Sequence, residues 1–246
     1  MNRDRIYSLP RQRVGEFTFD DSVADVFPDM IARSVPGYAS ILSMIEQLAG
    51  RFIRPGTNIY DLGCSLGAAT WLIRPQASMD CTLHAVDNSP AMIARLQQRL
   101  AELSPQEIAS GCAVETHQAD IRQVSLDRAS FVVLNFTLQF IPSVDREPLL
   151  QKICESLIPG GALLLSEKIS FEDDSQQALL NELHHDFKRA HGYSDLEIAQ
   201  KRTSIENMLI PEPLDAHLSR LQRVGFEVVA PWFQCFNFAS ILAIKN

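Results

Sequence analysis

The sequence predicts an α/β protein built on a mostly parallel, Rossmann-like sheet, and three observations support this. Short apolar segments alternate with helix-like segments between residues 57 and 167, which is typical of consecutive β-α-β units. Two apolar segments end in an acid, Asp61 and Asp87, and glycines follow the first one at positions 63 and 67. The last two apolar segments are joined by a link too short for a helical crossover, so they should pair antiparallel.

These patterns give a seven-stranded sheet with an antiparallel C-terminal strand. Ser89 and Pro90 mark the start of one helix, because serine caps helix N-termini and proline fits the first turn. We expect a single domain, residues 1–246, in which an N-terminal helical cap (1–55) and inserted helices without a strand (170–224) are added to the sheet. The expected strands are 57–62, 82–87, 112–117, 131–135, 162–167, 226–230 and 237–244; the expected helices of the cap and core are 20–27, 39–52, 67–76, 89–104 and 145–157.

Composition excludes several classes of protein. A chain of 246 residues that is 46% hydrophobic can bury a sizeable core. It has no apolar run long enough to span a bilayer, and its first residues lack the apolar core of a signal peptide. The five scattered cysteines favour the reducing cytoplasm. A net charge of −8 argues against direct nucleic-acid binding.

The glycine loop after the first strand predicts a nucleotide-like ligand. Glycine lets the backbone approach a ligand closely, and Asp87 ends the next strand, where an acid would accept both hydroxyls of a ribose. The loop also matches G-x-S-x-G, the turn that presents the nucleophile of α/β-hydrolases, which would make Ser65 reactive. A strand–turn–helix without a ligand is the other alternative. The hydrolase alternative leaves Asp61 and Asp87 unexplained.

The order of these motifs resembles the class I S-adenosylmethionine-dependent methyltransferases. Residues 61–67 (DLGCSLG) resemble the motif that holds the methionine end, Asp87 the ribose-binding acid, and Asp120-Ile121 the adenine-edge motif. Residues 157–161 (LIPGG) resemble the turn before the fifth strand. Such a series specifies only the cofactor, S-adenosyl-L-methionine.

Longer stretches resemble one family, the bacterial carboxy-S-adenosyl-L-methionine synthases. The matching stretches are 26–38 (VFPDMIARSVPGY), 61–70 (DLGCSLGAAT), 133–140 (VLNFTLQF), 184–190 (HHDFKRA) and 232–238 (WFQCFNF). The resemblance implies a cytoplasmic homodimer that carboxylates the methyl group of S-adenosyl-L-methionine with prephenate as carboxyl donor. A separate enzyme then uses carboxy-S-adenosyl-L-methionine to modify the wobble uridine of tRNA. The implied ligand contacts are Tyr38, Gly63, Cys64, Ser65, Asp87, Asn88, Asp120, Ile121, Asn135 and Arg202.

For several of these residues, the chemistry of the side chain itself also supports a ligand contact. Asp120 follows a strand, where an adenine amino group would donate to it. Asn135 ends an apolar strand, and a buried amide there needs a partner such as a ligand ammonium. The ring of Tyr38 would attract a sulfonium. Each has a structural alternative: a solvated loop carboxylate, an amide satisfied within the protein, or a core tyrosine.

Arg202 is the sharpest candidate. Residues 194–197 (SDLE) read as a capping box, and on the helix that they open Ile198, Ile205 and Leu209 define one face together with Arg202. A guanidinium on an apolar face needs an anion or a route to water, and its planar fork matches a carboxylate. The ligand's added carboxylate, a salt bridge within the protein and an exposed head group all satisfy this requirement.

No catalytic base or metal site is expected. His184 and His185 are adjacent on a helix and therefore point about 100° apart, which is poor geometry for joint chelation. Arg33 and Arg189 are candidates for steering an anionic second substrate. An ordinary methyltransferase acting on a small molecule or a tRNA uridine, and a subunit that binds S-adenosylmethionine without turnover, remain as alternatives.

Overall fold

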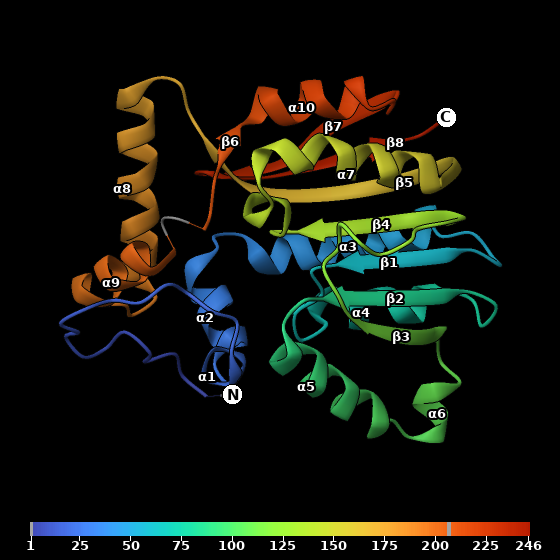
Figure 1. Cartoon of the computed structure of the whole chain (residues 1–246), viewed down its shortest axis with the longest axis horizontal. Coiled ribbons are helices and arrows are strands. Elements are labelled where there is room, and N and C mark those ends of the chain that lie inside the picture. The colour runs from blue at the N-terminus through green and yellow to red at the C-terminus, as the bar shows by residue number, and fades with distance from the viewer. Residues whose placement is uncertain (1, 206–207) are drawn as a thin grey trace.

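A computed structural model describes residues 2–205 and 208–246; residues 206 and 207 of the expected insert lie outside the described part of the chain. It confirms the α/β fold (Figure 1). The main sheet has the order β3-β2-β1-β4-β5-β8-β7, in which only β8 runs antiparallel to its neighbours. Its strands are β1 (Asn58–Leu62), β2 (Thr82–Asp87), β3 (Ala113–Gln118), β4 (Ala129–Asn135), β5 (Leu157–Ser170), β7 (Val228–Cys235) and β8 (Phe238–Ile244).

Helices cover both faces of this sheet, because successive side chains of a buried strand point to opposite faces. On one face, Leu149 of α7 (Ser143–Ser156) and Leu221 of α10 (Leu214–Arg223) belong to the same buried cluster as Val132. On the other, Ile45 of α3 (Tyr38–Phe52) and Ile73 of α4 (Ala68–Ile73) belong to the same buried cluster as Val133, and a 3-10 turn, η1 (Arg74–Gln76), extends α4. On this face α5 (Pro90–Ala101) contributes Ile93 and Leu96; the short α6 (Pro105–Ile108) follows it.

The N-terminal cap differs from the expected single helix over 20–27. The structure has two helices, α1 (Asp21–Ala24) and α2 (Phe27–Ser34). The expectation missed α2 because it did not use Pro28, which lies in the first turn of α2, where its fixed φ favours the start of a helix.

The inserted segment contains a strand that the sequence analysis did not expect. After α8 (Asp174–Ala190) and α9 (Asp195–Ile205), β6 (Glu212–Pro213) pairs in parallel with Ile169 and Ser170 of β5. β5 extends past its last pair with β4 at Ser166, so its edge is open to another strand. Glu212 is anchored there by the buried Arg146 and by Arg220, at 2.5 and 2.7 Å.

Two other strands have different bounds from those expected. β5 begins at Leu157 rather than at residue 162, and the backbone of Gly160 and Gly161 bonds with that of Lys245. β7 runs to Cys235 and contains Pro231, next to a register shift against β8. The sheet order makes β7 an edge strand, where proline is tolerated because one row of N–H groups has no partner in the sheet.

The N-terminal segment and the α8–α9 segment meet beyond the carboxyl ends of the strands (Figure 1). Gln200 of α9 donates to the backbone oxygens of Tyr7 and Leu9, both at 2.9 Å. The hydroxyl of Tyr193 donates to Asp4 at 2.5 Å, and Arg33 donates to the backbone oxygen of His191 at 2.7 Å. These contacts join distant segments into one cover over the sheet edge. No helix in the described residues is both long and apolar enough to cross a membrane.

Candidate functional site

A cavity of about 1140 Å³ lies between the carboxyl ends of the parallel strands and the helical cover. This edge of a parallel sheet is where open α/β folds bind ligands. All ten residues named from the sequence line it, so the structure brings them to one place: Tyr38, Gly63, Cys64, Ser65, Asp87, Asn88, Asp120, Ile121, Asn135 and Arg202.

The glycine loop between β1 and α4 forms one side of the cavity. Gly63 has a φ of 84°, and a Cβ atom added there would lie 2.2 Å from Thr137 Oγ1. Only glycine fits this combination of a left-handed backbone and a close neighbour. The N–H groups of Gly63 and Cys64 donate to the backbone oxygen of Val86 at 2.8 and 2.9 Å. The loop is therefore tied to β2 before it turns into α4.

Asp87 ends β2 and is held by the same loop. Its Oδ2 accepts from the N–H of Ser65 at 2.8 Å, and its Oδ1 from the N–H of Ser89 at 2.9 Å. Ser89 caps α5 by accepting from the N–H of Met92 at 3.2 Å, as the sequence predicted. Burial raises the pKa of Asp87 despite these bonds. Each oxygen keeps further acceptor capacity, while the exposed Asn88 lies at the rim.

Ser65 lacks the partner that a nucleophile would need. Its hydroxyl donates to the sulfur of Met92 at 3.3 Å, and no described histidine is hydrogen-bonded to it. A hydrolase nucleophile needs a base within hydrogen-bond reach. The geometry therefore argues against the hydrolase alternative.

Two buried acceptors line the cavity together with Tyr38. Asp61 ends β1, accepts from the hydroxyl of Thr70 at 2.6 Å, and has its pKa raised to about 6 by burial. Burial, and then the charge of Asp61, raise the pKa of Tyr38 well above its ordinary value. The Oδ1 atom of Asn135 is buried and has no hydrogen-bond partner among the described residues. A cationic ligand group here would satisfy both acceptors.

Asp120 and Ile121 follow β3 and also line the cavity. Asp120 is a quarter exposed and accepts from Arg122 at 2.6 Å. The hydrogen bond from Arg122 holds the pKa of Asp120 below its ordinary value. Ile121 is buried and presents an apolar surface beside it. A ligand amino group at Asp120 would have to share the carboxylate with Arg122.

Arg202 does not lie on an apolar face, so this part of the expectation was wrong. The capping box is present: Ser194 and Glu197 exchange hydrogen bonds. The helix ends at Ile205, however, so Leu209 is not on it, and Arg202 is exposed although Ile198 is buried. Arg202 lies where the main cavity meets a smaller one of about 380 Å³.

Three lysines in the cavity were not singled out from the sequence. We call Lys168, Lys188 and Lys201 the lysine group. Burial lowers the pKa of all three, to about 7 for Lys188 and about 8 for Lys201. Lys201 donates to Ser34 at 3.0 Å and pairs with Asp4 at 3.9 Å, whereas Lys168 and Lys188 form no ion pair with any residue in the described ranges. An anionic ligand would compensate their charges.

The other positive and imidazole groups are mostly structural. Arg33 is buried in contacts with Asp29 and His191, and Arg189 is paired with Asp186 and Asp195; neither lines the main cavity. The lysine group, in contrast, does line the main cavity. His184 bonds the backbone oxygen of Ser34 at 2.8 Å, and burial lowers its pKa to about 2.

The sheet order and the cavity at the strand ends are those of the class I S-adenosylmethionine-dependent methyltransferase fold. Residues 59–161 match the family model of a methyltransferase domain. The magnesium protoporphyrin IX methyltransferase of Synechocystis PCC 6803, solved with bound SAH, aligns over 88% of this chain and 87% of its own, with 15% identity and a TM-score of 0.58. Human N-acetylserotonin methyltransferase, solved with SAM, aligns over 92% and 55%, with 16% identity and a TM-score of 0.59.

Much closer relatives place the chain in one family. The carboxy-S-adenosyl-L-methionine synthase of Cronobacter sakazakii is 53% identical over 246 residues, 100% of this chain and 98% of that protein. The protein of that name from Escherichia coli O1:K1 is 52% identical over 99% of this chain and 97% of its own. The chain belongs to the carboxy-S-adenosyl-L-methionine synthase family, and is therefore an enzyme with a transferase fold.

Proposed function

We propose that this chain converts S-adenosyl-L-methionine and prephenate into carboxy-S-adenosyl-L-methionine and phenylpyruvate. The full-length 53% identity to a carboxy-S-adenosyl-L-methionine synthase carries the proposal. The cavity supports it, because acids line one side and the lysine group the other. A cationic sulfonium and an anionic carboxyl donor have opposite requirements, and these two sides match them.

S-adenosyl-L-methionine would lie along the strand ends. Asp87 accepts the two ribose hydroxyls, Asp120 and Ile121 bind the adenine edge, and the backbone of residues 63–65 lies along the methionine portion. The ligand ammonium donates to Asp61 and to the unpartnered oxygen of Asn135. Tyr38 covers the sulfonium, since an aromatic face attracts a cation.

Prephenate would lie between this ligand and the lysine group. It carries two carboxylates, and Lys168 and Lys188 lack ion-pair partners among the described residues. When prephenate aromatises to phenylpyruvate, it releases carbon dioxide and hydroxide. The hydroxide takes a proton from the sulfonium methyl group and becomes water, and the resulting ylide carbon bonds the carbon dioxide. The protein orients the reactants and excludes water, so no side-chain base is required.

The wider context extends this proposal. We infer one domain per chain, a cytoplasmic homodimer, and a product that is passed to a separate tRNA carboxymethyltransferase for wobble uridine modification. All five cysteines are free, which fits a reducing compartment. The net charge of −8 fits an enzyme that does not itself bind tRNA.

Mass spectrometry of a turnover reaction tests the function. Purified protein is incubated with S-adenosyl-L-methionine, with and without prephenate. The expected product is heavier than S-adenosyl-L-methionine by one carbon dioxide and appears only with prephenate, together with phenylpyruvate. S-adenosylhomocysteine formed with a methyl acceptor would instead identify an ordinary methyltransferase, and ligand binding without any product would identify a non-catalytic subunit.

A further inference from the structure

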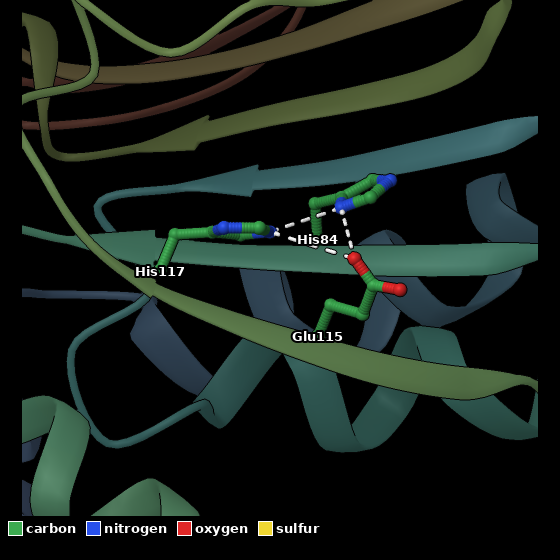
Figure 2. A group of neighbouring side chains, drawn as sticks. All are labelled: His84, Glu115 and His117. Atoms are coloured by element: carbon green, nitrogen blue, oxygen red, sulfur yellow. Dashed lines mark hydrogen bonds and ion pairs between the residues drawn. The ribbon is translucent and has the colours of Figure 1, made fainter.

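Three side chains with metal-binding atoms meet on the sheet, outside the ligand cavity (Figure 2). They are His84 of β2 and Glu115 and His117 of β3. The Nδ1 atom of His84 is 3.0 Å from Nε2 of His117 and 3.5 Å from Oε2 of Glu115. The same carboxylate oxygen is 4.0 Å from Nε2 of His117. One nitrogen from each ring and one oxygen therefore surround a common point.

Strand register brings these residues together. His84 lies opposite Glu115 in the parallel β2–β3 pair, and Val86 lies opposite His117. Glu115 and His117 are two positions apart on one strand, so their side chains point to the same face as that of His84. The backbone thus fixes the positions from which all three side chains project.

The spacing of the three atoms fits a bound metal ion. Ligand atoms about 2.1 Å from a metal lie roughly 3.0 Å apart at octahedral angles and roughly 3.4 Å apart at tetrahedral angles. The distances here, 3.0, 3.5 and 4.0 Å, require only small side-chain adjustments. The contact between the two imidazole nitrogens requires a proton on one of them, and a metal ion replaces that proton and bonds both nitrogens.

The site is held in place on one side and open on the other. The ring of His84 stacks on Tyr60 of β1, with centroids 4.8 Å apart and planes 18° apart. The side chains of His84, His117 and Glu115 are 16%, 36% and 59% exposed. The connection from β3 to β4, residues 119–128, contains no helix that would cover this face. Water can therefore complete the coordination of an ion.

We propose that His84, Glu115 and His117 bind a divalent transition-metal ion, with Zn²⁺ as the reference ion, which cross-links β2 to the edge strand β3. Two imidazoles and one carboxylate favour such an ion over Mg²⁺ or Ca²⁺, which prefer oxygen ligands. Asp87 and Asp120 each lie three residues beyond a histidine of the site. The ion therefore fixes the spacing of the two strands that carry these acids to the cavity. This inference rests on the cluster alone, not on the proposed reaction.

Calorimetric titration of tag-free, EDTA-treated and dialysed protein with ZnCl₂ tests the site. The expected result is one ion per chain, with a rise in the midpoint of thermal unfolding of about 5–10 °C at a hundredfold excess over Kd. His117→Ala and Glu115→Gln should each weaken Zn²⁺ at least about 10–100-fold, the range found when a supporting residue around a metal is lost. Both side chains are more exposed than that of His84, so both variants should fold, which circular dichroism checks.

Two control variants make the result decisive. Glu102→Gln removes an exposed carboxylate from the end of α5 and should leave Zn²⁺ affinity unchanged. His185→Ala removes one of the two adjacent histidines on α8, so that they can no longer bind an ion together, and it should also leave Zn²⁺ affinity unchanged. Zn²⁺ binding that survives in both His117→Ala and Glu115→Gln, or that is lost in His185→Ala, overturns the proposal, as does wild-type protein that binds no Zn²⁺.

Discussion

The two sides of the ligand cavity carry opposite charge and come from different parts of the chain. The strand-end side consists of Asp61, Asp87, Asp120 and Asn135 with the glycine loop, all between residues 61 and 135. The other side carries the lysine group and Arg202; Lys168 comes from the end of β5, and the remaining three cations come from α8 and α9. The acids are held at the strand ends by hydrogen bonds from neighbouring residues, whereas the cations are carried on long side chains. The cavity thus separates recognition of a cationic ligand from recognition of an anionic one, and each side can be tested alone.

Removing the Asp87 carboxylate should have the largest effect. In Asp87→Ala two charge-assisted hydrogen bonds to ribose are lost, each contributing about 1.5–3 kcal/mol. Affinity for S-adenosyl-L-methionine should therefore fall roughly a hundredfold or more, with folding retained. Calorimetry measures it, and Asp80→Ala, an exposed acid before β2, is the control. Near-unchanged binding in Asp87→Ala would remove this residue from the site.

The glycine loop can be tested by a matched pair of substitutions. Gly63→Ala places a Cβ atom against Thr137, whereas Gly160→Ala has a similar φ of 77° but no neighbour within 4 Å. The left-handed conformation costs each variant about 1–2 kcal/mol of stability. Gly63→Ala should lose more than that and should also weaken ligand binding, because Thr137 has to move. Denaturant unfolding and calorimetry measure both effects; equal losses in the two variants would contradict the close approach.

On the opposite side, Lys188→Met should weaken the anionic substrate while stabilising the empty protein. The pKa of Lys188 is about 7 against an ordinary 10.5, so between these values the unfolded chain binds more protons and stability rises with pH. The variant should lose this pH dependence. The anion requires the charged lysine, so its affinity in the wild type should fall as pH rises above about 7.

Binding measurements at pH 6 and 9 check this prediction, because prephenate affinity should fall about 10–150-fold in Lys188→Met at the lower pH. Lys245→Met, which removes a lysine at the end of β8, is the control. Prephenate affinity that does not depend on pH in the wild type would exclude Lys188 as its partner.

Arg202 should distinguish product from substrate. If its guanidinium binds the added carboxylate, Arg202→Ala should weaken carboxy-S-adenosyl-L-methionine more than S-adenosyl-L-methionine, by roughly tenfold or more. Arg202→Lys keeps the charge but loses the planar fork, so its preference for the carboxylated ligand should lie between those of the wild type and Arg202→Ala. The ratio of the two dissociation constants in the three proteins decides the matter. An unchanged ratio means that another group recognises the carboxylate.

Ser65→Ala should have the smallest effect. The backbone N–H that bonds Asp87 is retained, and only the contact between the hydroxyl and Met92 is lost. We expect less than about a tenfold change in turnover. Labelling of Ser65 by a fluorophosphonate, with loss of activity, would instead support a nucleophilic serine.

The strand-end side could be predicted from the sequence because parallel strands end at a common edge. An acid at the end of an apolar run, such as Asp61 or Asp87, is therefore predicted to lie at this edge. The lysine group could not be predicted, since a lysine is normally solvated, and these three are buried only because α8 and α9 pack over the end of β5, which carries Lys168. The prediction that Arg202 lies on an apolar helix face was wrong, because it assumed a helix that continues past Ile205 to Leu209.

The group formed by His84, Glu115 and His117 illustrates a second limit of prediction from sequence. His84 and His117 are 33 positions apart, and no local spacing links them. Only the register of β2 against β3 reveals that they share a face. β6 was missed for a related reason, since a two-residue strand has no periodicity and forms where β5 offers an open edge.

The joined cover has a consequence for the timing of the reaction. Because Gln200, Tyr193 and Arg33 tie the N-terminal segment to the α8–α9 segment, we expect that these segments move as one cover and that ligand release requires several hydrogen bonds to open together. Opening of such covers is often slower than chemistry. We therefore expect a burst of product in the first turnover, followed by a slower steady rate. The rate at which the cover opens, rather than the rate of bond formation, would then set the steady-state rate of product release.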